Sequence, residues 1–77
     1  MIDMTYDPEA DAVYIYIAHI SRGSIDRTDE IAPNVFVDRD AKGRILGIEV
    51  LTASKVLAPG DWRKARLPGT PASDAAE

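Results

Sequence analysis

The chain has 77 residues, no cysteine and a formal net charge of -4 at neutral pH. This length is one domain that buries only about 60% of its unfolded surface, so help from a partner subunit is expected. The absence of cysteine excludes disulfides, thiolate metal sites and a thiol nucleophile. No apolar run approaches the ~20 residues that cross a bilayer. Asp3 and Asp7 stand where a signal peptide carries Lys or Arg, which predicts a soluble cytoplasmic protein.

The charge is unevenly distributed along the chain. Residues 1–40 hold nine acidic and three basic residues, whereas residues 41–77 hold four acidic and six basic residues. The acidic half is expected to repel nucleic acid and to suit a basic protein partner. Solubility alone also explains these acids.

The pattern of the first forty residues predicts a β-hairpin followed by further strands. Residues 2–7 alternate apolar and polar side chains, as in a half-buried strand. Asp7 is placed to cap the following turn, and residues 12–18, "AVYIYIA", are apolar on both alternating sets. This second strand is therefore expected to be central and covered on both faces. Residues 24–32 form a polar strand, typical of a sheet edge.

A second hairpin is predicted from residues 34–38 and 44–51. Asp40 begins the connecting turn and Gly43 takes its left-handed position. In the closing strand, Gly47 is expected to leave room for a bulky neighbour.

Glu49 is unusual because it lies in the most apolar strand of the chain. If buried, it needs a partner such as Arg27 or Arg39. Otherwise it faces solvent.

The chain after residue 51 has three predicted parts. Thr52 is expected to cap a helix of about two turns over residues 53–58, which completes a domain of residues 1–58. Residues 59–67 form a short extension that carries Trp62 and several basic residues. Residues 68–77 are rich in small residues and proline and are expected to be disordered.

The candidate metal-binding and catalytic residues fit ordinary structural roles better than they fit a metal or catalytic site. Asp7, Glu9 and Asp11 resemble the start of a calcium loop, but Ala12 and Ala18 occupy the positions that require glycine and glutamate. We therefore expect no metal site there and no cofactor.

Two other groups leave alternatives open. Asp38 and Asp40 are an alternative small-molecule or divalent-metal site, although a turn explains them as well. His19 and Ser21 lie two residues apart. A catalytic triad also needs an orienting acid and an oxyanion site to converge on such a pair, and the sequence does not indicate either. An enzyme is therefore not favoured.

Trp62 lies in the one basic and aromatic cluster of the chain, with Arg63, Lys64 and Arg66. Three charges are a small footprint for nucleic acid. The interpretation favoured here is a Trp62 that packs on the sheet beside solvated basic residues.

Two stretches, "MTYDPEADAVYIYI" and "EIAPNVFVDRDAKGRILGIEVLTAS", together resemble a small bacterial family known as domain of unknown function 2283. The resemblance spans residues 3–57. It implies a small β-meander with a C-terminal helix and transfers no catalytic residue. Some members look like partners of small toxin-like proteins, which implies an antitoxin or adaptor role.

The favoured hypothesis is a non-enzymatic protein-interaction module. We expect an α+β, mainly β fold, with an antiparallel β-meander of four or five strands and a short C-terminal helix on one face. A second copy or a basic partner is expected to cover the other face. That second layer is expected to contain Tyr14, Tyr16, Phe36, Ile45 and Leu51. The candidate partner-binding residues are Asp7, Glu9, Asp11, Tyr14, Tyr16, Asp29, Glu30, Phe36 and Trp62.

Overall fold

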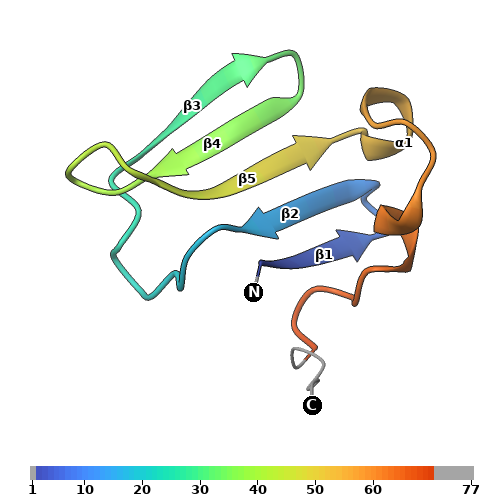
Figure 1. The fold of residues 1–77 in the computed structure, drawn as a ribbon. Helices are drawn as coiled ribbons and strands as arrows, with labels where there is room; N and C mark the ends of the chain where they lie inside the picture. Colours follow the sequence, from blue (N-terminus) through green and yellow to red (C-terminus); the bar gives the residue numbers. More distant parts are fainter. Residues whose placement is uncertain (1, 71–77) are drawn as a thin grey trace.

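A computed structural model of the chain describes residues 2–70, which form one five-stranded antiparallel sheet with two short helices (Figure 1). The elements are β1 (Asp3–Asp7), β2 (Ala12–Tyr16), β3 (Arg27–Ala32), β4 (Val35–Arg39), β5 (Ile45–Leu51), the helix α1 (Ala53–Val56) and the 3-10 helix η1 (Asp61–Lys64). The predicted mainly β fold, with an antiparallel sheet and a short C-terminal helix, is confirmed.

The strand order is β1-β2-β5-β4-β3. Strands β3, β4 and β5 form a meander, and β5 then pairs with β2 of the N-terminal hairpin. The two most apolar strands thus lie inside the sheet, and the polar strand β3 lies at an edge as predicted. Charged residues on an exposed edge oppose pairing with other chains.

Both predicted turns are present. The Asp7 carboxylate accepts hydrogen bonds from the backbone N–H groups of Glu9 and Ala10, at 3.0 and 3.2 Å. In the β4–β5 turn, the Asp40 carboxylate accepts the backbone N–H of Lys42 at 2.9 Å. Gly43 there has a φ of 84°, the left-handed conformation that glycine adopts at least cost.

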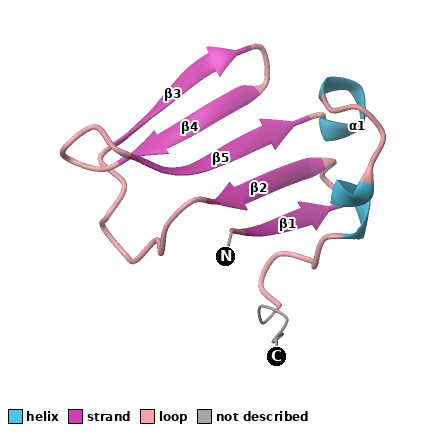
Figure 2. Ribbon diagram, in the orientation of Figure 1, coloured by secondary structure: helices cyan, strands magenta, loops and turns pink. Residues whose placement is uncertain are grey.

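One face of the sheet is covered by the C-terminal elements, and we call it the closed face. Its core consists of Val13, Val50 and Ala53, and residues of α1 and η1 pack against it. Both helices lie at the same end of the sheet (Figure 2). Trp62 packs edge-on against Tyr6, with ring centroids 5.0 Å apart, and its indole N–H donates to the Ala58 carbonyl. Residues 59–67 therefore pack on the domain.

The predicted cap of α1 is wrong. The helix has one turn rather than two, and Thr52 makes no side-chain capping bond because its φ of 54° is left-handed rather than extended. Asp11 caps the helix instead. Its carboxylate accepts the Ser54 backbone N–H at 3.1 Å and the Ser54 hydroxyl at 2.6 Å. Its carbonyl accepts the Ala53 N–H at 2.8 Å.

The chain after η1 returns along the edge strand β1. The backbone N–H of Tyr6 donates to the Arg66 carbonyl at 3.0 Å, and Arg66 forms a parallel bridge with Thr5. This contact occupies part of the β1 edge. The predicted disordered tail, residues 68–77, lies outside the described residues from position 71 onward.

Among residues 2–70, neither helix is long and apolar enough to cross a membrane.

Candidate binding face of the sheet

The second face of the sheet is aromatic and acidic, and we call it the open face. The strand register places Tyr14 and Phe36 on either side of Glu49, and Tyr16 and Asp38 on either side of Gly47. Alternation along β5 adds Leu51 to the same face. The expectation for Ile45 is wrong, because the register shift between Asp38 and Arg39 sets Ile45 opposite Arg39, on the side of Val37. The helices pack on the closed face. Strand β2 is therefore central, but within residues 2–70 its open face is covered only in part, by Arg66 beside Tyr16, so the expectation of two covered faces is met only in part.

The Tyr14 ring lies against Gly47 on the open face. A Cβ atom at residue 47 would lie only 2.3 Å from the Tyr14 hydroxyl oxygen, so the ring occupies the space that glycine leaves. The prediction for Gly47 is confirmed. The Tyr14 hydroxyl donates to one Asp38 oxygen at 2.5 Å, and the Thr28 hydroxyl donates to the other. Burial and the bond to Asp38 hold the pKa of Tyr14 well above its ordinary value, so the hydroxyl stays a donor.

Tyr16 continues the aromatic surface. Its ring centroid lies 4.7 Å from that of Tyr14. The Arg66 guanidinium lies 6.0 Å from the Tyr16 centroid and forms an ion pair with Asp3. The hydrogen bond from Arg66 holds the pKa of Asp3 below its ordinary value. A guanidinium on an aromatic ring beside a carboxylate is a favourable arrangement.

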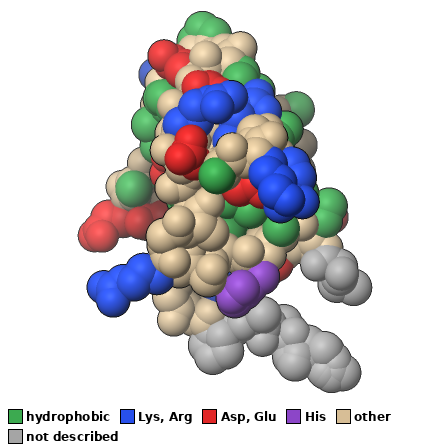
Figure 3. Space-filling model, turned by 90° about the vertical axis from the view of Figure 1, so that its left-hand side faces the viewer, with side chains coloured by type: hydrophobic (Ala, Val, Ile, Leu, Met, Phe, Trp, Pro, Cys, Tyr) green, Lys and Arg blue, Asp and Glu red, His purple; other side chains and the backbone are tan. Residues whose placement is uncertain are grey.

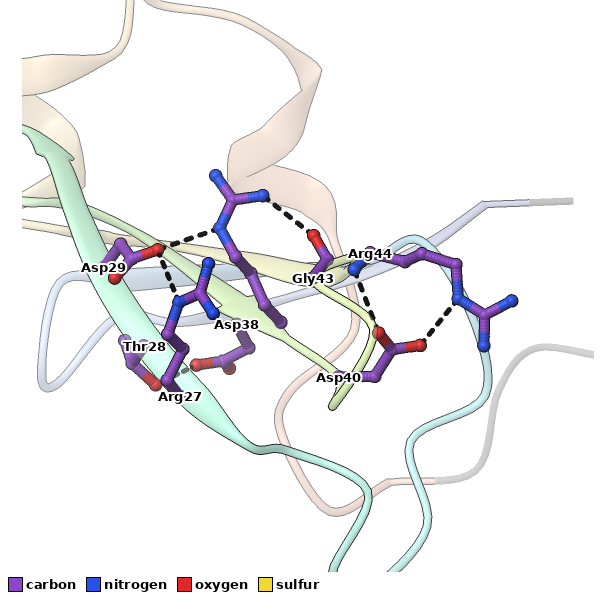
Figure 4. A network of polar contacts seen from close by, with 8 residues as sticks. Arg27, Thr28, Asp29, Asp38, Asp40, Gly43 and Arg44 are labelled. Carbon is purple, nitrogen blue, oxygen red and sulfur yellow. Dashed lines mark hydrogen bonds and ion pairs between the residues drawn. The ribbon is translucent and has the colours of Figure 1, made fainter.

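Glu49 lies at the centre of the open face and is half-buried. Within residues 2–70, no hydrogen bond or ion pair involves its carboxylate. The expected partners, Arg27 and Arg39, instead bind Asp29 at 3.3 and 2.8 Å (Figure 4). These two bonds hold the pKa of Asp29 below its ordinary value, with Arg39 the stronger cause.

A shallow hollow of about 360 Å³ lies beside Glu49 on the open face. Its lining residues include Asp7, Tyr14, Tyr16, Glu49, Leu51 and Pro68.

The nine candidate partner-binding residues do not form a single surface. Those on the open face are Asp7, Tyr14, Tyr16, Glu30 and Phe36. Those engaged within the chain elsewhere are Asp11, Asp29 and Trp62. Glu9 is exposed in the β1–β2 turn. The sequence reasoning missed Glu49 as a site residue, although its place in the most apolar strand was a usable signal.

The oxygens of Asp38 and Asp40 are used in separate contacts. Asp38 accepts hydrogen bonds from the hydroxyls of Tyr14 and Thr28. Asp40 instead accepts the backbone and side-chain N–H groups of Arg44 (Figure 4). The backbone bond from Arg44 lowers the pKa of Asp40. No group of three or more metal-ligating side chains occurs among residues 2–70. The geometry thus gives the divalent-metal alternative no support.

Other charged and titratable groups lie at the end of the sheet that holds the β4–β5 turn. Basic and acidic side chains are interspersed there (Figure 3). His19 and Ser21 are both exposed, and no hydrogen bond between them occurs in the described part of the chain. This end of the molecule is a mixed-charge surface.

These features define a small α+β protein whose antiparallel sheet is closed on one face and open on the other. The family model described as "Protein of unknown function (DUF2283)" matches residues 3–54, and the chain belongs to this family. The resemblance inferred from the sequence is thus confirmed. No curated protein and no solved structure matches the chain.

Proposed function

We propose that the protein is a non-enzymatic protein-interaction module that binds its partner through the open face of the sheet. The observation that carries this proposal is the group of half-buried aromatic side chains, Tyr14, Tyr16 and Phe36, on a face that neither helix of residues 2–70 covers. Aromatic residues are enriched at the centres of protein interfaces, where they bury much area for little lost entropy.

The size of the sheet supports the same proposal. A sheet of this length gains stability when both faces are covered, and the described helices cover only one. The edges are poor alternatives for docking. Strand β3 carries charged side chains, and part of β1 is occupied by Arg66.

Two occupants fit the proposal: a second copy of the chain, which would make a homodimer, or a basic partner protein. A basic partner agrees with the net charge of -4 and with an antitoxin-like or adaptor role in the cytoplasm. With such a partner, the association rate should fall as salt concentration rises, because salt screens the attraction that steers the encounter.

The experiment that tests this proposal is light scattering after size exclusion. The purified chain is measured alone over a range of concentrations, and again after mixing with the product of its neighbouring gene. We expect a mass above that of one chain in at least one of the two measurements.

Two variants locate the contact. Phe36→Ser should weaken the complex by about tenfold or more, because it removes an aromatic contact from the open face. Ile31→Ser is the matched control, since Ile31 is 57% exposed on the edge strand and its replacement also removes an apolar side chain. A monomer in both measurements, or equal binding by the two variants, would refute the proposal.

A further inference from the structure

We propose that Glu49 receives the guanidinium or ammonium group of a basic side chain of a different protein. This inference rests on the proposed function, in which the open face binds a protein. It adds the anchoring residue and the chemistry of the group that meets it.

The position of Glu49 makes an apolar occupant unfavourable. Glu49 is a half-buried residue between Tyr14 and Phe36, and its carboxylate has no ion pair inside residues 2–70. A partner that covered this carboxylate with apolar atoms would remove its remaining water and leave the charge uncompensated. A cationic side chain would cover it and supply the missing charge.

The open face already contains one cation, Arg66, bound to an aromatic ring and a carboxylate. Arg66 lies over the Tyr16 ring and pairs with the carboxylate of Asp3. Glu49 offers the same groups, a carboxylate beside the rings of Tyr14 and Phe36. Tyr14 is held in place by Gly47 and Asp38, so little side-chain freedom is lost when a cation binds.

The charges of the open face favour a different protein over a second copy. Carboxylates outnumber cations on this face: Asp3, Asp7, Glu30, Asp38 and Glu49 accompany Arg66. Two copies stacked through it would bring like charges together. Arg66 is not free to relieve this, because it binds Asp3 and the Thr70 carbonyl. A copy that offered a basic residue remote from the open face would make a head-to-tail contact, which does not close as a two-fold dimer.

The test uses a pair of peptides and the full chain. The probes are the acetylated and amidated peptide Ala-Arg-Phe-Arg-Ala and the same peptide with citrulline in place of arginine, which keeps the shape and removes the charge. Binding is followed by NMR titration of the backbone amides. We expect the arginine peptide to shift the signals of Tyr14, Phe36 and Glu49 and to bind about tenfold more tightly than the citrulline peptide.

Two charge-neutralising variants separate Glu49 from the general acidity of the chain. Glu49→Gln should remove the preference for arginine. Asp61→Asn should keep it, because the Asp61 side chain is 98% exposed on η1 and remote from the open face. Equal affinity of the wild-type chain for the two peptides, or a preference that survives Glu49→Gln, would overturn the inference.

The remaining outcomes distinguish this inference from the proposed function. A complex with the neighbouring gene product that tolerates Glu49→Gln but not Phe36→Ser would retain the interaction module and reject Glu49 as its anchor. A complex that tolerates both changes would reject the open face itself. Glu49 signals that move with protein concentration, together with a dimeric mass, would assign a second copy as the occupant and overturn the inference.

Discussion

The two faces of the sheet are built from neighbouring residues of the same strands but bury them differently. On the closed face, Val37 is 1% exposed and Val13 fully buried, and the helices complete a small apolar core. On the open face, Phe36 and Tyr14 remain half-buried, and polar groups pair with one another across the strands. The closed face therefore supplies packing, whereas the open face keeps its aromatic side chains half-buried and its polar groups paired across the strands.

The difference also separates two roles of charged residues. Asp11 and Asp29 are satisfied within the chain, by Ser54 and by Arg39. Glu49 is not satisfied by any residue of the described chain. The acidic residues thus differ in that Asp11 and Asp29 are paired within the described chain, whereas Glu49 is not.

The largest expected effect contrasts adjacent residues on opposite faces. Val37→Ala should lower the free energy of unfolding by about 2 kcal/mol, because it leaves a cavity in the closed face. Phe36→Ala removes more atoms but should cost only about 1 kcal/mol, because its side chain is half-buried. Urea unfolding followed by the fluorescence of the single tryptophan measures both. A larger loss for Phe36→Ala would mean that the open face is part of the core.

A second effect concerns the arrangement of the open face. Gly47→Ala should lower the free energy of unfolding by about 1 to 2 kcal/mol, because the new Cβ displaces the Tyr14 ring and breaks its bond to Asp38. The double variant Gly47→Ala/Tyr14→Ala should lose less stability than the sum of the two single variants. Additive losses in the same urea experiment would show that the two residues do not depend on each other.

The smallest effect is pH-dependent and tests the cap of α1. The hydrogen bonds from Ser54 lower the pKa of Asp11, so its charged form stabilises the folded state above the ordinary pKa and this contribution is lost as pH falls through the lowered pKa. Asp11→Asn should therefore lower Tm by a few degrees, about 3 to 5 °C, at pH 7. The difference from the wild type should begin to narrow below about pH 4, the ordinary pKa, and close only as pH falls through the lowered pKa.

Differential scanning calorimetry between pH 3 and pH 7 measures this difference. Asparagine tolerates the left-handed φ of 53° at residue 11, so the variant keeps the backbone conformation while it removes the charge and one acceptor oxygen. Asp61→Asn serves as the control and should leave Tm unchanged, because its side chain is 98% exposed. A difference as large at pH 3 as at pH 7 would show that the charge of Asp11 does not account for the loss.

The sequence alone determined most of the local structure of this protein, apart from the length and cap of α1. Alternating apolar residues placed the strands, Asp7 and Gly43 marked the turns, and the polar composition of residues 24–32 identified an edge. These features depend on neighbours within a few residues, which a single sequence displays. The sequence also indicated that Gly47 admits a bulky side chain, because a glycine in an apolar strand needs such a reason.

Only the tertiary structure decided which distant groups meet. The insertion of β5 between β2 and β4 brings Glu49 between Tyr14 and Phe36, and the β1–β2 turn brings Asp11 to the start of α1. Arg27 and Arg39 satisfy Asp29 and leave Glu49 without a cation. Such pairings depend on strand order and on the face to which each side chain points, and neither is encoded by the spacing of residues along the chain.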